Sequence, residues 1–203
     1  MHSDGKGLTG SMKTHMKYRI ILLIVLIGIM GFIYYMSDQP VVQSGEMSFG
    51  IDRWICSHFV DDFNQLTLQE QQAVVLELDF WVRKSAHFVE YMMLGAVLMM
   101  AEQLFHNWRR ASDCKGKSQN NRNRLRIGAI VAITVGSLYA VFDEIHQYFV
   151  PGRACQLRDM VIDICGVAAG VLMVFSVLWV RNQHIDRKQR VLKESKRSIT
   201  GCL

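Results

Sequence analysis

The sequence predicts an all-α, multi-pass integral membrane protein: a bundle of four transmembrane helices plus an external interfacial helical segment. Half of the 203 residues are hydrophobic, and they are concentrated in four blocks. Each block is long enough to cross a hydrocarbon core of roughly 30 Å at about 1.5 Å per helical residue. The basic residues fall mainly on one side of the resulting topology. This composition excludes a disordered chain, and the length favours one domain.

The first apolar block, residues 18–36, predicts a permanent membrane anchor. Its single charge is Arg19, at the border, and it ends in Tyr34 and Tyr35, which suit the membrane interface. The block is not followed by the small-residue cleavage site of a secretory signal. It is hydrophobic all round, whereas a helix of a soluble bundle, the competing interpretation, keeps a polar stripe.

Three further blocks are long enough to span, and each carries ionisable residues near one end. The predicted organisation is a cytoplasmic N-terminal tail (1–17), a first transmembrane helix (18–36), an external segment (37–83), a core with three transmembrane helices (84–180, with spans at about 86–105, 125–145 and 159–180) and a basic cytoplasmic tail (181–203).

The positions of Lys and Arg predict the orientation. Eighteen of the 23 basic residues lie in the N-terminal segment to residue 19, in the 106–126 connection or in the tail from residue 181. The positive-inside rule places these segments, and therefore both termini, in the cytoplasm. They sum to +14 and the remainder to −9, so the net charge of +5 reflects topology. The basic pI therefore needs no nucleic-acid partner, and none is expected.

The external segment is expected to contain helix. Thr67 and Glu70 have capping-box spacing, which predicts a helix that begins near Leu68 and runs toward the second span. Residues 53–63 form an amphipathic stretch that suits the outer membrane surface. Cys56 and Cys155 are both predicted outside, and the sequence leaves open whether they pair.

Ionisable residues recur at helical spacing at one end of the second, third and fourth spans, and the topology places all of them at the external face. Charges within a span usually face the bundle and have partners, so these residues predict an external polar pocket between the three spans. Gly95, Gly166 and Gly170 would let the helices below the pocket approach closely. The predicted pocket residues are Arg83, Lys84, His87, Glu90, Tyr91, Asp143, Glu144, His146, Gln147, Arg153, Asp159 and Asp163.

The motifs indicate no metal and no cofactor. HExxH and CxxC are both absent, and no single helix carries three ligands at metal-binding spacing. Satisfied polar networks at helix ends use the same residue types. No residue is assigned a catalytic role on sequence grounds.

Four separated strings resemble the VanZ-like membrane protein family over about residues 36–180: MSDQPVVQSGEMS, RKSAHFVEYMMLG, YAVFDEIHQYFVPGR and RDMVIDICGVAAG. The positions that match the family's pattern include Ser37, Gln39, Asp143, Arg153 and Asp163. The family's prototype is associated with teicoplanin resistance in bacteria. The resemblance implies a multi-pass protein of the bacterial plasma membrane with a role in the cell envelope.

Three functions are compatible with these residues. The first is a binding protein whose pocket holds a lipid-linked envelope precursor, a glycopeptide or a membrane lipid, since Lys and Arg near an interface suit anionic headgroups. The second is a membrane-embedded hydrolase or transferase that acts on an envelope precursor, with His87 or His146 as general acid or base. The third is a structural protein without a ligand. A transporter is less favoured because four spans without a repeat make a small pathway.

Overall fold

The computed structural model describes residues 5–112 and 121–200, and no strand occurs within these ranges. Helices account for nearly all of them. In chain order the elements are α1 (Gly5–Ser37), α2 (Val41–Phe59), a 3-10 turn η1 (Phe63–Gln65), α3 (Leu68–Ser112), α4 (Asn121–Gln147) and α5 (Leu157–Thr200).

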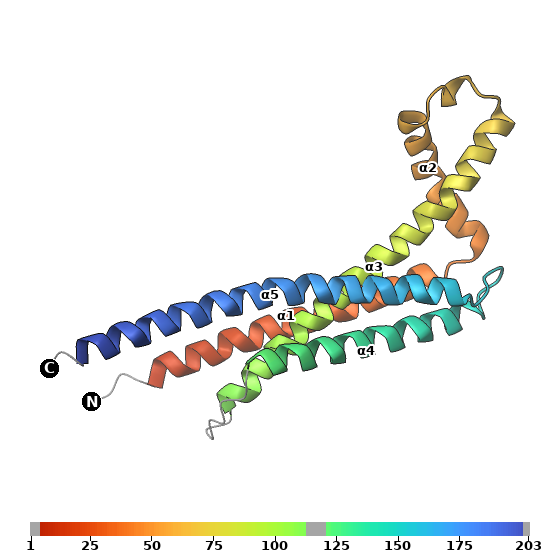
Figure 1. Cartoon of the computed structure of the whole chain (residues 1–203). Helices are drawn as coiled ribbons and strands as arrows, with labels where there is room; N and C mark the ends of the chain where they lie inside the picture. Colours follow the sequence, from red (N-terminus) through yellow and green to blue (C-terminus); the bar gives the residue numbers. More distant parts are fainter. Residues whose placement is uncertain (1–4, 113–120, 201–203) are drawn as a thin grey trace.

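The four long helices form a bundle, and α2 with the first part of α3 projects from one end of it as a hairpin (Figure 1). Helix α3 contacts α1, α2, α4 and α5, so it is the central element. The beginning of α1 and the end of α5 lie at the end of the bundle opposite the hairpin (Figure 1). The basic segments therefore gather at one end and the predicted polar residues at the other.

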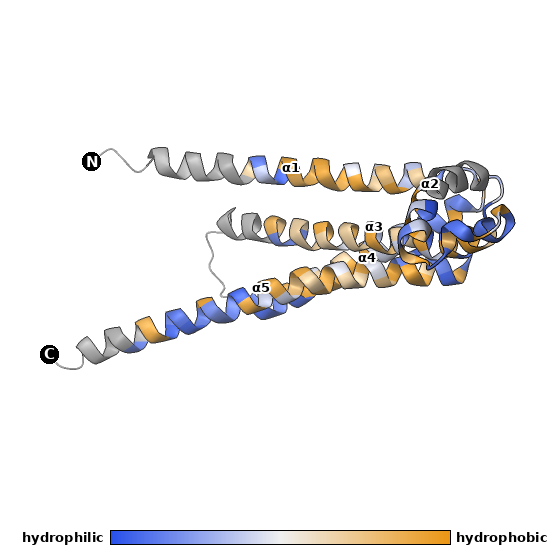
Figure 2. Ribbon diagram, turned by 90° about the horizontal axis from the view of Figure 1, so that it is seen from above, coloured by the Kyte–Doolittle hydropathy of each residue, from blue (hydrophilic) through white to orange (hydrophobic). Residues whose placement is uncertain are grey.

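Within the part of the chain that the structure describes, four helices are long and apolar enough to cross a membrane, as predicted. Figure 2 shows their apolar residues along the middle of the bundle and hydrophilic residues at the hairpin and along the end of α5. Large apolar side chains such as Ile24 (63% exposed) and Leu138 (64% exposed) point outward, as a hydrocarbon solvent allows. By length and composition, the candidate spans lie within Met16–Ser37, Leu68–Phe105, Asn121–Gln147 and Leu157–Leu192.

The helices continue well beyond the predicted apolar blocks. Helix α3 already begins at Leu68, where the capping box was predicted: the Thr67 backbone N–H donates to Glu70 Oε2 at 2.9 Å, and the Glu70 N–H donates to Thr67 Oγ1 at 3.4 Å. Two backbone N–H groups at the start of the helix, which have no partner within the helix, are thus hydrogen-bonded. Helix α5 continues through the predicted basic tail to Thr200.

Helices α3 and α5 pack backbone against backbone because glycines replace side chains at their contact. A Cβ atom at Gly170 would lie 1.9 Å from the Met92 carbonyl oxygen, and one at Gly95 would lie 2.2 Å from that of Val167. Small residues permit such close approach between helices in membranes. The prediction of close packing at these glycines is confirmed, and Tyr91, Leu94, Val167 and Val171 form the buried core beside them.

The hairpin has a small core of its own. Cys56 of α2, Phe63 of η1 and Val75 of α3 are buried against one another. The predicted amphipathic piece at residues 53–63 differs in extent: α2 begins earlier, directly after Pro40, and its helix ends at Phe59. Asp62 takes a left-handed conformation, with φ 57°, and starts the turn that brings the chain back to α3.

Candidate functional site

A polar cavity of about 300 Å³ lies at the end of the bundle from which the hairpin projects. Its walls come from α3, the end of α4, the loop between α4 and α5, and the first turn of α5, with Met36 from the end of α1. The structure therefore brings together polar residues from separate parts of the chain. The predicted pocket residues that line this cavity are Arg83, Lys84, His87, Glu90, Gln147, Arg153 and Asp159.

A void of about 10 Å³ shares part of the cavity's lining and reaches deeper into the bundle. Its volume is close to that of one water molecule. Glu144 and Asp163 line it together with Lys84 and His87, and these two carboxylates are 1% and 2% exposed. Two further predicted residues thus lie below the cavity rather than on its open wall.

Lys84 of α3 and Asp159 of α5 form an ion pair across the cavity. Arg158 Nε lies 3.7 Å from the other Asp159 oxygen, and the Arg158 guanidinium lies over the Phe80 ring at 4.8 Å. Arg83 pairs with Asp79 one turn earlier on the same helix. The Asp159 carboxylate therefore joins α3 and α5, the two helices that carry most of the cavity's charge.

Arg153 joins the loop to the end of α1. Its Nε donates to the Gln39 carbonyl oxygen at 2.9 Å, its Nη2 to the Met36 carbonyl at 3.2 Å and its Nη1 to Gln147 Oε1 at 3.2 Å. Carbonyl groups at a helix C-terminus lack partners within the helix and favour a cation. Burial lowers the pKa of the Arg153 guanidinium from its usual range, and the nearby charge of Arg83 lowers this pKa further.

The first span also supplies a side chain, although the pocket was predicted from the other three spans alone. Ser37 Oγ donates to Asp143 Oδ2 at 2.8 Å, and Gln147 Nε2 lies 3.2 Å from both Ser37 Oγ and Asp143 Oδ2. All three side chains are buried. Asp143 is therefore a buried connector between α1 and α4, located beside the cavity rather than on its wall.

The loop between α4 and α5 is fixed by a carboxylate and a glycine. Glu144 Oε1 accepts a hydrogen bond of 2.7 Å from the Gln156 backbone N–H. Gly152 has φ 79°, a conformation that favours glycine, and it directly precedes Arg153. The turn thus sets the direction from which Arg153 enters the site.

Two of the predicted pocket residues lie elsewhere. His146 stacks on Tyr34 of α1, with ring centroids 4.6 Å apart, and its Nε2 lies 3.2 Å from Asp38 Oδ1. His146 and Asp143 both contact residues at the end of α1, but Asp143 does so from a buried position and His146 from a partly exposed one. Tyr91 is fully buried in the core. Only His87 of the two candidate histidines borders the cavity.

Several polar atoms around the cavity have no hydrogen-bond partner among the described residues. They are His87 Nδ1, Glu90 Oε2, Glu144 Oε2 and Asp159 Oδ1. His87 Nδ1 and Glu90 Oε2 lie 3.9 Å apart, too far for a direct hydrogen bond. Buried polar groups normally have a partner, so these atoms have the capacity to bind water or a ligand.

No three His, Cys, Asp or Glu side chains within the described ranges are placed to hold one metal ion. Cys56 and Cys155 are free thiols, buried and exposed respectively, so they do not form a disulfide in this structure. Burial raises the pKa of the Cys56 thiol, and the charge of Asp52 raises it further.

The site contains Ser37 and the carbonyl of Gln39, which were not among the predicted pocket residues. A signal exists for Ser37, a polar residue directly after an apolar span, whereas Gln39 acts through its backbone carbonyl. Gln156 was also missed. Its role rests on a backbone N–H, which any residue other than proline carries.

Four apolar helices among the described residues, with a charged cavity at one end of their bundle, define a polytopic membrane protein. The VanZ/LLP1 family model matches residues 22–180, so the chain belongs to this family. The match begins within the first apolar block and covers the hairpin and the three further predicted blocks. Comparison with curated proteins and with solved structures gave no significant match.

Proposed function

We propose that this VanZ-like protein lies in the bacterial plasma membrane with both termini in the cytoplasm, and that its external polar cavity binds a lipid-linked or glycopeptide-type ligand. Through that binding it contributes to glycopeptide (teicoplanin) resistance. The observation that carries the proposal is the cavity itself, where the cations Lys84, Arg153 and Arg158 lie beside polar atoms without partners.

The neighbourhood of the cavity suits an amphiphilic ligand. Trp81, on α3 just before Arg83 and Lys84, is 65% exposed, and Phe80 forms part of the cavity wall. Aromatic side chains of this kind favour the membrane interface. A ligand anchored in the bilayer can therefore present an anionic headgroup to the cations while its apolar part stays beside the aromatic side chains.

His87→Ala tests the cavity with little structural cost, since His87 Nδ1 has no hydrogen-bond partner to lose. His184→Ala, on the exposed side of α5 beyond the cavity, is the matched control. We expect cells with His87→Ala to lose the teicoplanin phenotype at unchanged membrane abundance, while the control behaves as wild type. If both variants retain the phenotype, the cavity is not the functional site.

Binding is measured directly with the purified protein in nanodiscs and a labelled lipid-linked cell-wall precursor. We expect saturable binding that Arg158→Gln weakens and that Arg187→Gln, an exposed arginine far along α5, leaves unchanged. Equal loss in both variants would indicate unspecific attraction to positive charge. Absence of saturable binding, with the variants equally abundant, would favour a structural protein without a ligand.

A second candidate function is a hydrolase or transferase that acts on an envelope precursor. The observation that favours it is the position of His87 beside Glu90 on the cavity wall, where both side chains have polar atoms without partners. A histidine on the wall of a polar cavity is a common general acid or base. Product formation in the nanodisc assay, abolished by His87→Ala, would establish this function; stoichiometric binding without product would exclude it for that precursor.

The proposed orientation has its own test. Reporter fusions after Asn120 and after residue 203 are expected to give cytoplasmic signals, because the basic segments lie on that side. A fusion within the hairpin, for example after Phe59, is expected to give an external signal. An external signal after Asn120 would reverse the orientation and place the polar cavity at the cytoplasmic face.

A further inference from the structure

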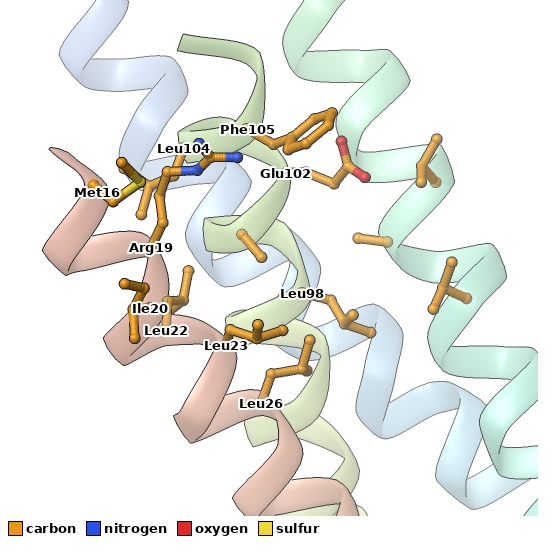
Figure 3. Close-up of a pocket in the computed structure, with 14 residues that line it drawn as sticks. Met16, Arg19, Ile20, Leu22, Leu23, Leu26, Leu98, Glu102, Leu104 and Phe105 are labelled. Atoms are coloured by element: carbon orange, nitrogen blue, oxygen red, sulfur yellow. The ribbon is translucent and has the colours of Figure 1, made fainter. Parts of the chain in front are cut away.

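A second cavity, of about 610 Å³, lies between α1, α3 and α4 at the end of the bundle opposite the polar cavity (Figure 3). Twelve of its 14 lining residues are apolar, and the two charged ones are Arg19 and Glu102. Its volume is typical of small-molecule sites. An apolar cavity of this size does not hold ordered water well, because water there finds too few polar partners.

The cavity is open toward the surrounding bilayer. Ile20 and Leu23 on its α1 wall are 53% and 56% exposed, and Val135 on its α4 wall is 46% exposed. All three belong to spanning segments. The opening therefore faces hydrocarbon, and the molecules present there in highest concentration are lipids.

The cavity has the depth of one leaflet. Its α1 wall extends from Met16 to Leu26, which is about 15 Å at 1.5 Å per residue and half of a hydrocarbon core of roughly 30 Å. The length of this wall and its apolar lining suit an acyl chain of one leaflet.

The charge at the cavity's mouth favours an anionic headgroup. Arg19 extends from α1 toward α3, with its guanidinium 5.5 Å from the Phe105 ring centre (Figure 3). Among the described residues that line the cavity, Arg19 is the single cation and Glu102 the single carboxylate. Arginine donates to phosphate oxygens in a fixed geometry.

We propose that this cavity binds one acyl chain of an anionic phospholipid from the leaflet at the basic end of the bundle, with Arg19 on the lipid phosphate. The site is separate from the polar cavity and independent of its ligand. A lipid bound there lies between α1 and the pair α3 and α4. The lipid then becomes part of the packing that holds the first span.

The test uses protein in nanodiscs of equal parts phosphatidylglycerol and phosphatidylcholine with identical chains, followed by native mass spectrometry. We expect one retained phosphatidylglycerol per chain. Arg19→Gln is expected to lower the preference for phosphatidylglycerol about fivefold, while Lys17→Gln, an exposed cation at a similar depth, changes it little. Equal effects of the two substitutions would overturn the assignment to Arg19.

Filling the cavity is the second arm. Ala101→Phe places a ring in the space and is expected to abolish the retained lipid, whereas Ile27→Phe, on the exposed face outside the cavity, leaves it. Unchanged retention in Ala101→Phe would overturn the proposal. Palmitate that displaces the phosphatidylglycerol completely at equal concentration would also overturn it, because the site would then select a free fatty acid.

A third arm needs no variant. Phosphatidylglycerol with a photoactivatable acyl chain is expected to label residues 16–26 and 98–105 of the wild-type protein, in preference to the exposed apolar residues Leu172 and Val177 of α5. Even labelling over all lipid-facing helices would indicate ordinary surrounding lipid and overturn the proposed site.

Discussion

The Ser37 hydroxyl donates a 2.8 Å hydrogen bond to Asp143 Oδ2, and thereby joins the last turn of α1 to the last two turns of α4 across 106 residues of sequence. Both side chains are almost completely buried. Gln147 completes the group through its contacts with both residues. The carboxylate beside the polar cavity thus depends on a hydroxyl from the first span.

Ser37→Ala is expected to destabilise the protein by about 1–3 kcal/mol, because a buried carboxylate oxygen loses a donor. The measurement is thermal unfolding in nanodiscs, followed by loss of helical circular dichroism. Ser176→Ala is the control, since the Ser176 hydroxyl donates only to the Leu172 carbonyl of its own helix and is exposed. Equal stability of both variants would show that Asp143 does not need the serine.

Lys84 and Asp159 are expected to be coupled. In a double-mutant cycle with Lys84→Met and Asp159→Asn, each single substitution leaves a half-buried charge without its partner, so the double variant should lose less stability than the sum of the two. A coupling energy of about 0.5–3 kcal/mol is expected. Additive losses of stability would mean that solvent screens the pair.

Gly170→Ala is expected to separate α3 from α5, because its Cβ would meet the Met92 carbonyl at 1.9 Å, and backbone cannot move aside as a flexible side chain can. A loss of about 1–3 kcal/mol in unfolding free energy is expected. Gly28→Ala is the matched control, since a Cβ there meets nothing within 4 Å. Alanine at residue 28 should leave stability unchanged or raise it by about 0.5–1 kcal/mol.

Single-cysteine variants that retain only Cys56 or only Cys155 are expected to differ in alkylation rate. Thiolate is the reactive form, and both burial and a raised pKa reduce it at Cys56, whereas Cys155 is exposed. A membrane-impermeant maleimide at neutral pH should therefore label Cys155 first, and the Cys56 rate should still be rising with pH where an ordinary thiol levels off. Denatured protein is the control for equal intrinsic labelling.

The sequence predicts the spans well because the bilayer imposes a simple requirement of length and apolarity on each block, such as residues 18–36. The start of α3 was also predictable, since the capping box at Thr67 and Glu70 is local chemistry. Most polar residues that line the cavity were found because charge inside a span is rare.

The pairings inside the site could not be predicted in the same way. Periodicity places Asp143 and His146 on neighbouring faces of one helix, but it does not say which of the two side chains borders the pocket. His146 was therefore assigned to the pocket, although it stacks on Tyr34. The role of Ser37 depends on the relative depth of α1 and α4, which is set by tertiary packing.

The uninterrupted course of α3 constrains how the gene can vary in length. Val75 in the hairpin core, His87 at the polar cavity and Phe105 at the apolar cavity all lie on this one helix. A one-codon insertion between Val75 and His87 would rotate the hairpin against both cavities by about 100° and shift it by about 1.5 Å. Viable insertions and deletions should therefore be confined to the connections between helices, where they do not change the relative directions of the side chains along α3.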